Sequence, residues 1–290
     1  MDFSKPVILG LPRKGDSFKE TICRLVRFLL GKGCTVYVER RIARVYHLTD
    51  VIPVDAENAG TVADLAIVVG GDGSMIGASR NLARTGTPVI GVNRGHLGFL
   101  TDLRPDSCEQ DLQEVLSGGY VTEKRPLTDV SVSEDGIVLE TRQFLNEAVI
   151  HPKQIAHMIE FEVFIDSRFM NSMKADGLIV SSPTGSTAYA LSAGGPILTP
   201  DISAYCLIPM FPHTLSNRPI VISDSREVTV DFLGDEGSRV TIDGQQSINV
   251  SPHQKISVRK SSYELTLIHL KGHSYYDILR EKLGWGSKLF

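Results

Sequence analysis

Asp72, which lies between glycines in the run Gly70-Gly71-Asp72-Gly73, is the residue best placed to do chemistry in this chain. It follows the apolar run Ala66–Val69, which is typical of a buried strand. It precedes Met75–Thr85, a predicted helix for which Ser74 is a suitable N-cap. The carboxyl ends of strands border the ligand crevice in open α/β sheets, and helix N-termini with bare amides bind phosphate. Asp72 is therefore a candidate general base, metal ligand or helix cap.

Two further polar groups have residue types suited to binding a ligand. Asn146-Glu147 closes a strand-like run, and its amide can pair with a base edge or ribose while its carboxylate accepts from a hydroxyl. In Asp176–Tyr189 a buried strand runs into small hydroxyl residues and a glycine, and Tyr189 offers a ring for stacking. The structural alternatives are a polar strand end for the first group and a plain turn for the second.

Several other kinds of chemistry lack their motifs in this sequence. There is no P-loop, no HRD or DFG element of the protein kinases and no G-x-S-x-G elbow of the hydrolases. No H-x-x-x-H or Cys/His spacing indicates a metal site made by the protein alone. The four cysteines are scattered without a CxxC pair, which predicts reduced thiols in a cytoplasmic protein.

The overall composition is that of an ordinary soluble protein with room for two domains. The chain has 290 residues, of which 42% are hydrophobic and 22% charged, and a formal net charge of −4. No basic excess points to nucleic acid or to an anionic membrane. No apolar run approaches the roughly 20 residues that span a bilayer, and the N-terminus lacks the apolar core of a signal peptide.

The first half of the chain alternates predicted strands and helices. The strands are Pro6–Gly10, Thr35–Val38, Leu65–Val69 and Pro88–Val92, and the helices are Ser17–Leu30, Met75–Thr85 and Asp106–Leu116. This alternation predicts a Rossmann-like α/β domain over residues 1–124, with a mostly parallel sheet covered by helices on both faces. The segment 40–60 has no clear period and is predicted to be a loop with a short helix.

The second half is rich in short predicted strands with turn residues between them. These strands are Leu127–Ser133, Gly136–Ala148, Met158–Ile165, Leu178–Val180, Leu207–Met210, Pro219–Ile222, Val228–Phe232, Val240–Ile242, Lys255–Val258 and Tyr263–Ile268. They predict a β-sandwich-like domain over residues 125–269. A helical period returns in Tyr275–Leu283, so we expect residues 270–290 to pack back on the first domain.

The motifs, taken together and in order, resemble those of bacterial NAD kinases over nearly the whole chain. The matching motifs are Gly70–Gly73, Gly91–Leu100, Asn146-Glu147, Asp176–Tyr189, Met210–Ser216, Asp243-Gly244-Gln245 and Leu283-Gly284-Trp285. The Gly-Gly-Asp-Gly loop alone is shared with diacylglycerol kinases, sphingosine kinases and phosphofructokinases. The combination is much more specific than that loop.

The resemblance implies an enzyme that phosphorylates the 2′-hydroxyl of the adenosine ribose of NAD to give NADP. ATP would be the phosphate donor, with a divalent metal such as Mg²⁺, and family members form homodimers or homotetramers. By similarity Asp72 is the proton acceptor, and Gly73 lies against the nucleotide. The implied NAD-binding residues are Asn146, Glu147, His157, Lys174, Asp176, Thr187, Ala188, Tyr189, Ala190, Leu191, Ser192 and Gln245. Lys174 departs from the arginine that the family often has at this position.

Two other functions are compatible with parts of the sequence. A lipid or sugar kinase would share the Gly-Gly-Asp-Gly loop, but the Asp176–Tyr189 segment and Asn146-Glu147 argue against it. A non-catalytic dinucleotide sensor would keep the binding loops without the reaction. The sequence also leaves open whether polyphosphate replaces ATP, whether NADH is accepted, and whether Asp72 acts as a base or orients the hydroxyl.

Overall fold

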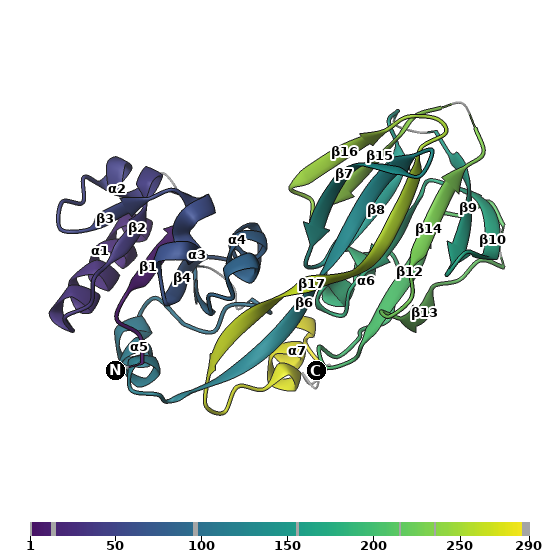
Figure 1. The fold of residues 1–290 in the computed structure, drawn as a ribbon. Helices are drawn as coiled ribbons and strands as arrows, with labels where there is room; N and C mark the ends of the chain where they lie inside the picture. The colour runs from purple at the N-terminus through teal and green to yellow at the C-terminus, as the bar shows by residue number, and fades with distance from the viewer. Residues whose placement is uncertain are drawn as a thin grey trace. The chain divides into compact units, whose positions relative to one another are not determined.

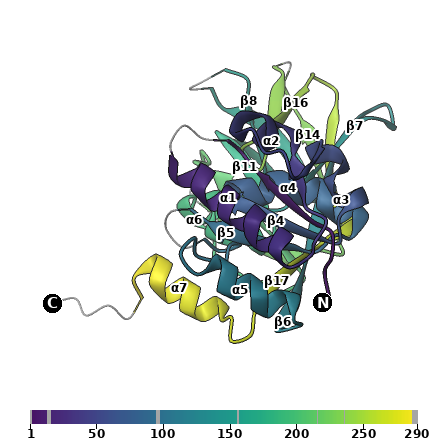
Figure 2. The ribbon, with the colours of Figure 1, turned by 90° about the vertical axis from the view of Figure 1, so that its left-hand side faces the viewer.

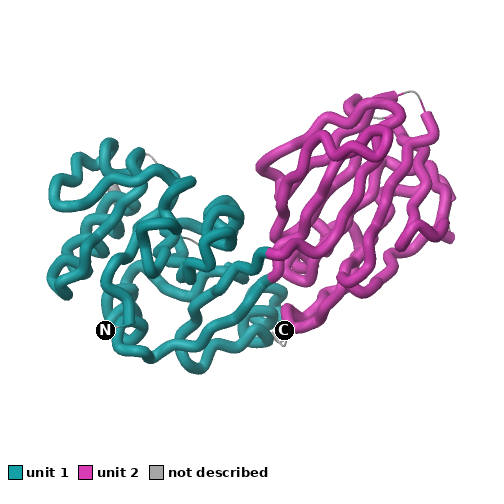
Figure 3. Tube along the Cα trace, in the orientation of Figure 1, with its two compact units in different colours: residues 1–125, 263–290 teal, residues 126–262 magenta. Residues whose placement is uncertain are grey.

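The computed structural model describes residues 2–12, 16–94, 98–154, 157–214, 216–234 and 236–285. The chain divides into two compact units, one formed by residues 1–125 with 263–290 and one by residues 126–262 (Figure 3). Two long strands, β6 (Tyr120–Glu134) and β17 (Lys255–Leu270), run through the boundary. The return to the first unit falls at residue 263, earlier than the expected 270, because β17 is one continuous strand and not the two predicted runs.

A parallel sheet forms the centre of the first unit, as predicted (Figure 1). Its strand order is β17-β5-β4-β1-β2-β3, and each neighbouring pair is parallel. The strands are β1 (Pro6–Gly10), β2 (Tyr37–Glu39), β3 (Ile52–Val54), β4 (Leu65–Gly70) and β5 (Val89–Asn93). β4 is buried along its whole length, which explains why its sequence is uniformly apolar.

Helices cover both faces of this sheet, which confirms the predicted α/β architecture (Figures 1 and 2). Alternate strand residues such as Ile67 and Val69 pack in one core with α1 (Asp16–Gly31), α2 (Arg40–Tyr46) and α5 (Cys108–Leu116). The short helices η1 (Ala56–Asn58) and α3 (Ala59–Val62), with α4 (Asp72–Thr85), lie on the opposite side. The prediction of a loop with a short helix over residues 40–60 was incomplete. The segment contains α2, β3 and η1, each of which is too short to show a period.

The second unit is a β-sandwich, also as predicted. One sheet contains β9 (Ile159–Ile165), β10 (Arg168–Ala175) and β14 (Val228–Phe232) beside β17, with β7 (Ile137–Phe144) paired to β6. The other sheet has the order β13-β12-β11-β8-β15-β16. Its strands are β8 (Glu147–Pro152), β11 (Gly177–Ser181), β12 (Ala204–Met210), β13 (Ile220–Ser223), β15 (Ser238–Ile242) and β16 (Gln246–Val250). Inward side chains of both sheets, including Phe144, Phe161 and Tyr205, form one core.

Three details of the second unit differ from the prediction. β10 and β16 were missed, since their sequences are largely polar and exposed. The predicted strand Gly136–Ala148 was wrong as a single run, because it breaks at Leu145-Asn146 into β7 and β8. This break matters for function, since it places Asn146 in a connection between two strands and not within one.

The last described helix, α7 (Tyr275–Leu283), belongs to the first unit, so the expected return of the C-terminal tail is confirmed for residues 270–285. Ile278 and Leu279 of α7 are buried. The Tyr275 ring lies 6.2 Å from the ring of Phe99. None of the helices in the described ranges is long and apolar enough to cross a membrane. The four cysteines are free thiols.

Candidate functional site

Asp72 lies in the first turn of α4, directly after β4 ends at Gly70. The N-cap of this helix is Gly71, whose backbone is extended (φ −110°, ψ −169°). The prediction of Ser74 as N-cap was therefore wrong, because the chain enters the helix as soon as the strand ends. Ser74 instead lies inside the first turn, where its amide donates to the Gly71 carbonyl at 2.9 Å.

The Asp72 carboxylate is held by backbone amides of the segment that follows β5. Its Oδ2 accepts from the amide of Phe99 at 2.9 Å, and its Oδ1 accepts from the amide of Leu100 at 3.0 Å. A Cβ at Gly98 would lie 2.1 Å from Asp72 Oδ1, so a side chain there would force the Asp72 carboxylate to move. The carboxylate is thus fixed in orientation at the carboxyl end of the parallel sheet. Residues 95–97 of the Gly91–Leu100 motif, which include His96, lie outside the described residues.

In the second unit, Asp243 organises the connection that contains Asn146. Its carboxylate accepts from the amides of Leu145 (3.1 Å), Asn146 (2.8 Å) and Glu147 (3.2 Å). Asp243 begins the turn between β15 and β16 and has a φ of 50°. This role was missed in the sequence analysis. An Asp-Gly pair is a strong turn signal, so the turn at Asp243 could have been predicted, but its bonds to the distant amides could not.

Asn146 and Glu147 are buried with polar atoms that lack a hydrogen-bond partner among the described residues. The atoms are Asn146 Oδ1 and Glu147 Oε2, in residues exposed by only 8% and 6%. Burial, together with the nearby charge of Asp243, raises the pKa of Glu147 from 4.5 to about 8. A buried polar group without a partner is costly, so both groups are suited to a ligand that supplies the missing hydrogen bond.

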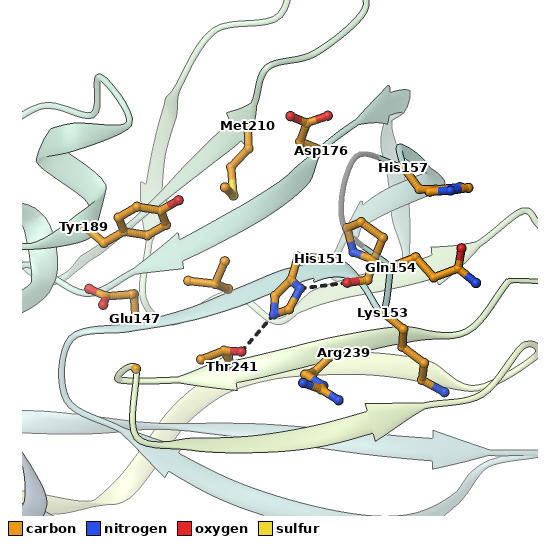
Figure 4. Close-up of a pocket in the computed structure, with 13 residues that line it drawn as sticks. Glu147, His151, Lys153, Gln154, His157, Asp176, Tyr189, Met210, Arg239 and Thr241 are labelled. Atoms are coloured by element: carbon orange, nitrogen blue, oxygen red, sulfur yellow. Dashed lines mark hydrogen bonds between the residues drawn. The ribbon is translucent and has the colours of Figure 1, made fainter.

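A cavity of about 660 Å³ opens on the outer face of the sheet that contains β8 and β15 (Figure 4). Glu147, Val149 and His151 alternate along β8 and so share this face, while Ala148 and Ile150 point into the core. The remaining lining residues are Pro152, Lys153, Gln154, His157, Asp176, Tyr189, Met210, Arg239, Thr241 and Gly244. His151 is fixed by contacts of its ring nitrogens with the Thr241 hydroxyl (2.8 Å) and the Pro152 carbonyl (2.9 Å). The volume lies in the usual range for small-ligand sites.

The cavity brings together four of the residues singled out from the sequence. Glu147, His157, Asp176 and Tyr189 all line it. Lys174 lines a second cavity of about 520 Å³, also bordered by His157, and forms an ion pair with Glu160 at 2.6 Å. Ala190 is buried in a small apolar cluster behind β11 and β12. The other expected binding residues, Asn146, Thr187, Ala188, Leu191, Ser192 and Gln245, do not line the 660 Å³ cavity.

The hydroxyl groups of the Asp176–Tyr189 segment hold its own backbone in place. Ser182 Oγ donates to the Leu145 carbonyl, and Ser186 Oγ accepts from the Leu198 amide at 2.9 Å. The segment continues through η2 (Thr184–Thr187) into the short helix α6 (Tyr189–Ser192). Tyr189 remains 47% exposed, so its ring is available to a ligand.

The fold and the site combine a parallel-sheet unit that fixes a carboxylate with a sandwich unit that contains a small-ligand cavity. Residues 12–120 match the family model of the ATP-NAD kinase N-terminal domain, and residues 145–270 match that of the C-terminal domain. The chain belongs to the ATP-NAD kinase family and is a kinase that acts on NAD.

Similar proteins agree with this assignment. The NAD kinase of Shewanella sp. (strain ANA-3) is 54% identical over 285 residues, which cover 98% of this chain and 92% of that protein. The NAD kinase of Photobacterium profundum is 49% identical over 290 residues, covering 99% of each chain.

Two solved structures share the fold. A yeast NADH kinase complexed with NADH has a TM-score of 0.89 at 22% identity, covering 100% of this chain and 90% of that chain. An NAD kinase from Archaeoglobus fulgidus in complex with ATP has a TM-score of 0.73 at 25% identity, covering 97% and 100%.

Proposed function

We propose that this kinase transfers the γ-phosphoryl group of ATP to the 2′-hydroxyl of the adenosine ribose of NAD, giving NADP and ADP. The observation that supports this most directly is the Asp72 carboxylate, held by the amides of Phe99 and Leu100 at the end of β4. Phosphoryl transfer depends mainly on positioning and electrostatics, so a carboxylate of fixed orientation suits the acceptor of the hydroxyl proton. The hydroxyl oxygen forms the new P–O bond, the bond to ADP breaks, and the proton passes to Asp72.

The second unit is assigned to binding NAD. Asn146 Oδ1 and Glu147 Oε2 supply buried hydrogen-bonding atoms for the adenosine part, and the exposed Tyr189 ring supplies a stacking surface. The family resemblance adds the remaining contacts, at Gly73, His157, Lys174, Asp176, Thr187, Ala188, Ala190, Leu191, Ser192 and Gln245. The same resemblance leads us to expect a homodimer or homotetramer, and the free thiols are consistent with a cytoplasmic protein.

A divalent metal such as Mg²⁺ fits the residues around Asp72. Magnesium prefers oxygen ligands, and each Asp72 oxygen accepts one amide hydrogen from the described residues, which leaves it a lone pair. Asp72 would therefore contribute one carboxylate to the ion. When bound, the metal neutralises charge on the transferred phosphoryl group. The one cluster of three metal-ligating side chains among the described residues contains two histidines, which suit Mg²⁺ poorly.

An assay that pairs NAD or NADH with ATP or polyphosphate tests the proposal. We expect NADP to form from NAD, ATP and Mg²⁺, and to disappear when the metal is removed with a chelator. A parallel panel of lipids and sugar phosphates tests the rival kinases. Preference for one of those acceptors would overturn the proposal, and tight NAD binding without transfer from either donor would indicate a sensor.

A further inference from the structure

A second cluster of charged side chains lies in the first unit and has no part in the function proposed above. His269, at the end of β17, is only 2% exposed. Its Nδ1 lies 2.7 Å from Asp102 Oδ2, and its Nε2 lies 3.1 Å from Glu123 Oε2. His273 adds a contact of 3.2 Å to the same Asp102 oxygen, and Arg125 pairs with Glu123 at 2.9 Å.

The hydrogen bonds of this cluster keep its groups charged despite their burial. Burial by itself would lower the pKa of His269, but hydrogen bonds to Asp102 and Glu123 raise it to about 9. Burial would likewise raise the pKa of Asp102, but its bonds to His269 and His273 lower it to about 2. The cluster therefore contains an imidazolium between two carboxylates at neutral pH, which is a strong, charge-assisted link.

The arrangement of the two imidazole rings favours this link over a metal site. Asp102, His269 and His273 place their ligand atoms within 4.8 Å of one another. However, the two rings stack at 3.8 Å with an interplanar angle of 27°. An ion about 2 Å from both ring nitrogens would then lie out of the plane of at least one ring, where that nitrogen has no lone pair.

Asp102 belongs to the same short segment that holds Asp72. The segment begins at Gly98, donates its Phe99 and Leu100 amides to Asp72, and ends at Leu103. Leu103 is fixed by backbone bonds to β5, since its carbonyl accepts from the Asn93 amide at 2.8 Å. Between these points, the Asp102 side chain is the only described charged group of the segment that reaches across to β17.

We propose that the cluster of Asp102, His269 and His273 positions Asp72 for catalysis by anchoring the segment 98–103, whose amides orient the Asp72 carboxylate. This inference rests on the role of Asp72 in the proposed function. None of the three residues touches substrate in this proposal. They act through the backbone, as outer partners orient a functional group.

The variant Asp102→Asn, which keeps the shape and removes the charge, tests this positioning. Hydrogen exchange of the Phe99 and Leu100 amides, followed by NMR, should become about tenfold faster as the segment opens more often. The kcat for NADP formation should fall about tenfold, at the lower end of what the loss of an outer partner costs, while KM for NAD changes little. A general loss of stability would not be confined to these two amides.

His273→Ala is a second, milder variant, since it removes the 3.2 Å contact to Asp102 and the ring stack on His269 but keeps the buried bonds of His269 to Asp102 and Glu123. It should shift exchange and kcat in the same direction by a smaller factor, even if Asp102→Asn folds poorly.

Glu109→Gln is the matched control, because it removes an ion pair with Arg24 in the same unit and should change neither readout. Unchanged exchange at Phe99 and Leu100 in both cluster variants would overturn the positioning. Full turnover in Asp72→Asn would instead overturn the role of Asp72, and the exchange rates would still decide the positioning.

Discussion

Two carboxylates, Asp72 and Glu147, have opposite hydrogen-bonding environments in the protein alone. Both oxygens of Asp72 already accept backbone amides in the protein alone. Glu147 is buried, has no partner for Oε2 among the described residues, and has a pKa raised to about 8. The first group is oriented before any ligand arrives, whereas the second depends on the ligand to satisfy it. This difference suits a group that acts in the reaction and a group that recognises a substrate.

Each site also depends on a glycine that lets another group approach closely. A Cβ at Gly98 would lie 2.1 Å from Asp72 Oδ1 and 2.4 Å from Thr101 Oγ1. A Cβ at Gly185 would lie 2.2 Å from the Asn146 carbonyl oxygen. The absence of a side chain at Gly98 therefore preserves the orientation of a carboxylate in one unit. The absence of a side chain at Gly185 preserves the path of the backbone beside Glu147 in the other unit.

The largest effect is expected for Asp72→Asn. The variant loses the proton acceptor and turns an NH₂ group toward one of the two amides that now donate to the carboxylate. We expect kcat to fall about a thousandfold, within the usual range for a general base. NAD binding, measured by calorimetry, should stay nearly the same because all but one of its other assigned contacts lie in the second unit and Gly73 is unchanged in the variant. Wild-type turnover in this variant would show that Asp72 does not act in the reaction, so the proposed difference in role between Asp72 and Glu147 would be wrong.

Alanine at the two glycines tests the same contrast by steric means. Gly98→Ala should displace the Asp72 carboxylate and lower kcat about a hundredfold, as misplacement of a catalytic group by about 1 Å can do. Gly185→Ala should shift Asn146 and raise KM for NAD about tenfold, which corresponds to about 1.4 kcal/mol of binding. Steady-state kinetics distinguish the two results.

Gly31→Ala is the control for both glycine variants, since a Cβ there meets nothing within 4 Å. It should leave kcat and KM unchanged. If Gly98→Ala changed only KM, or Gly185→Ala only kcat, the assignment of catalysis and recognition to the two sites would be wrong.

The architecture was predictable because it follows from local patterns. Apolar runs such as Leu65–Val69 and the helical period of Ser17–Leu30 indicate their elements directly, and their alternation indicates a parallel sheet. Short or polar elements such as β3 and β10 have no such signal, since pairing with neighbouring strands stabilises them. The break at Leu145-Asn146 was also invisible, because Asp243, far along the chain, holds the amides of that connection.

The candidate site was predictable in its residues more than in its contacts. Glu147, Asp176 and Tyr189 stood out by type, and His157 was implied only by the family resemblance; all four line one cavity. The hydroxyls of Ser182 and Ser186 stood out equally but bond to backbone. His269 gave no signal at all, because an isolated histidine in a strand shows neither of the carboxylates that face it. Long-range electrostatic partners of this kind depend on the fold and not on spacing in the sequence.

The smallest effect on binding, and the sharpest contrast with Asp72, is expected for Glu147→Gln. A carboxyl with a pKa of about 8 is mostly protonated at pH 7, so the amide replaces a neutral group of the same shape. The affinity for NAD at pH 7 should therefore change by less than about threefold, since one neutral hydrogen-bonding group replaces another. The same acid-to-amide change would thus be severe at Asp72 and mild at Glu147.

The stability of this variant should depend on pH in a characteristic way. Native Glu147 keeps its proton up to about pH 8, whereas the unfolded chain releases it near 4.5. The native state thus binds more protons in this window, and the free energy of unfolding of the wild type falls as pH rises through it. Glutamine has no such proton, so the Tm of Glu147→Gln relative to wild type should rise between pH 5 and 8, by on the order of 5 °C. All other titrating groups are the same in the variant and the wild type, so their contributions cancel in this difference. A difference in Tm that stays constant from pH 5 to 8 would show that Glu147 is charged in the native protein.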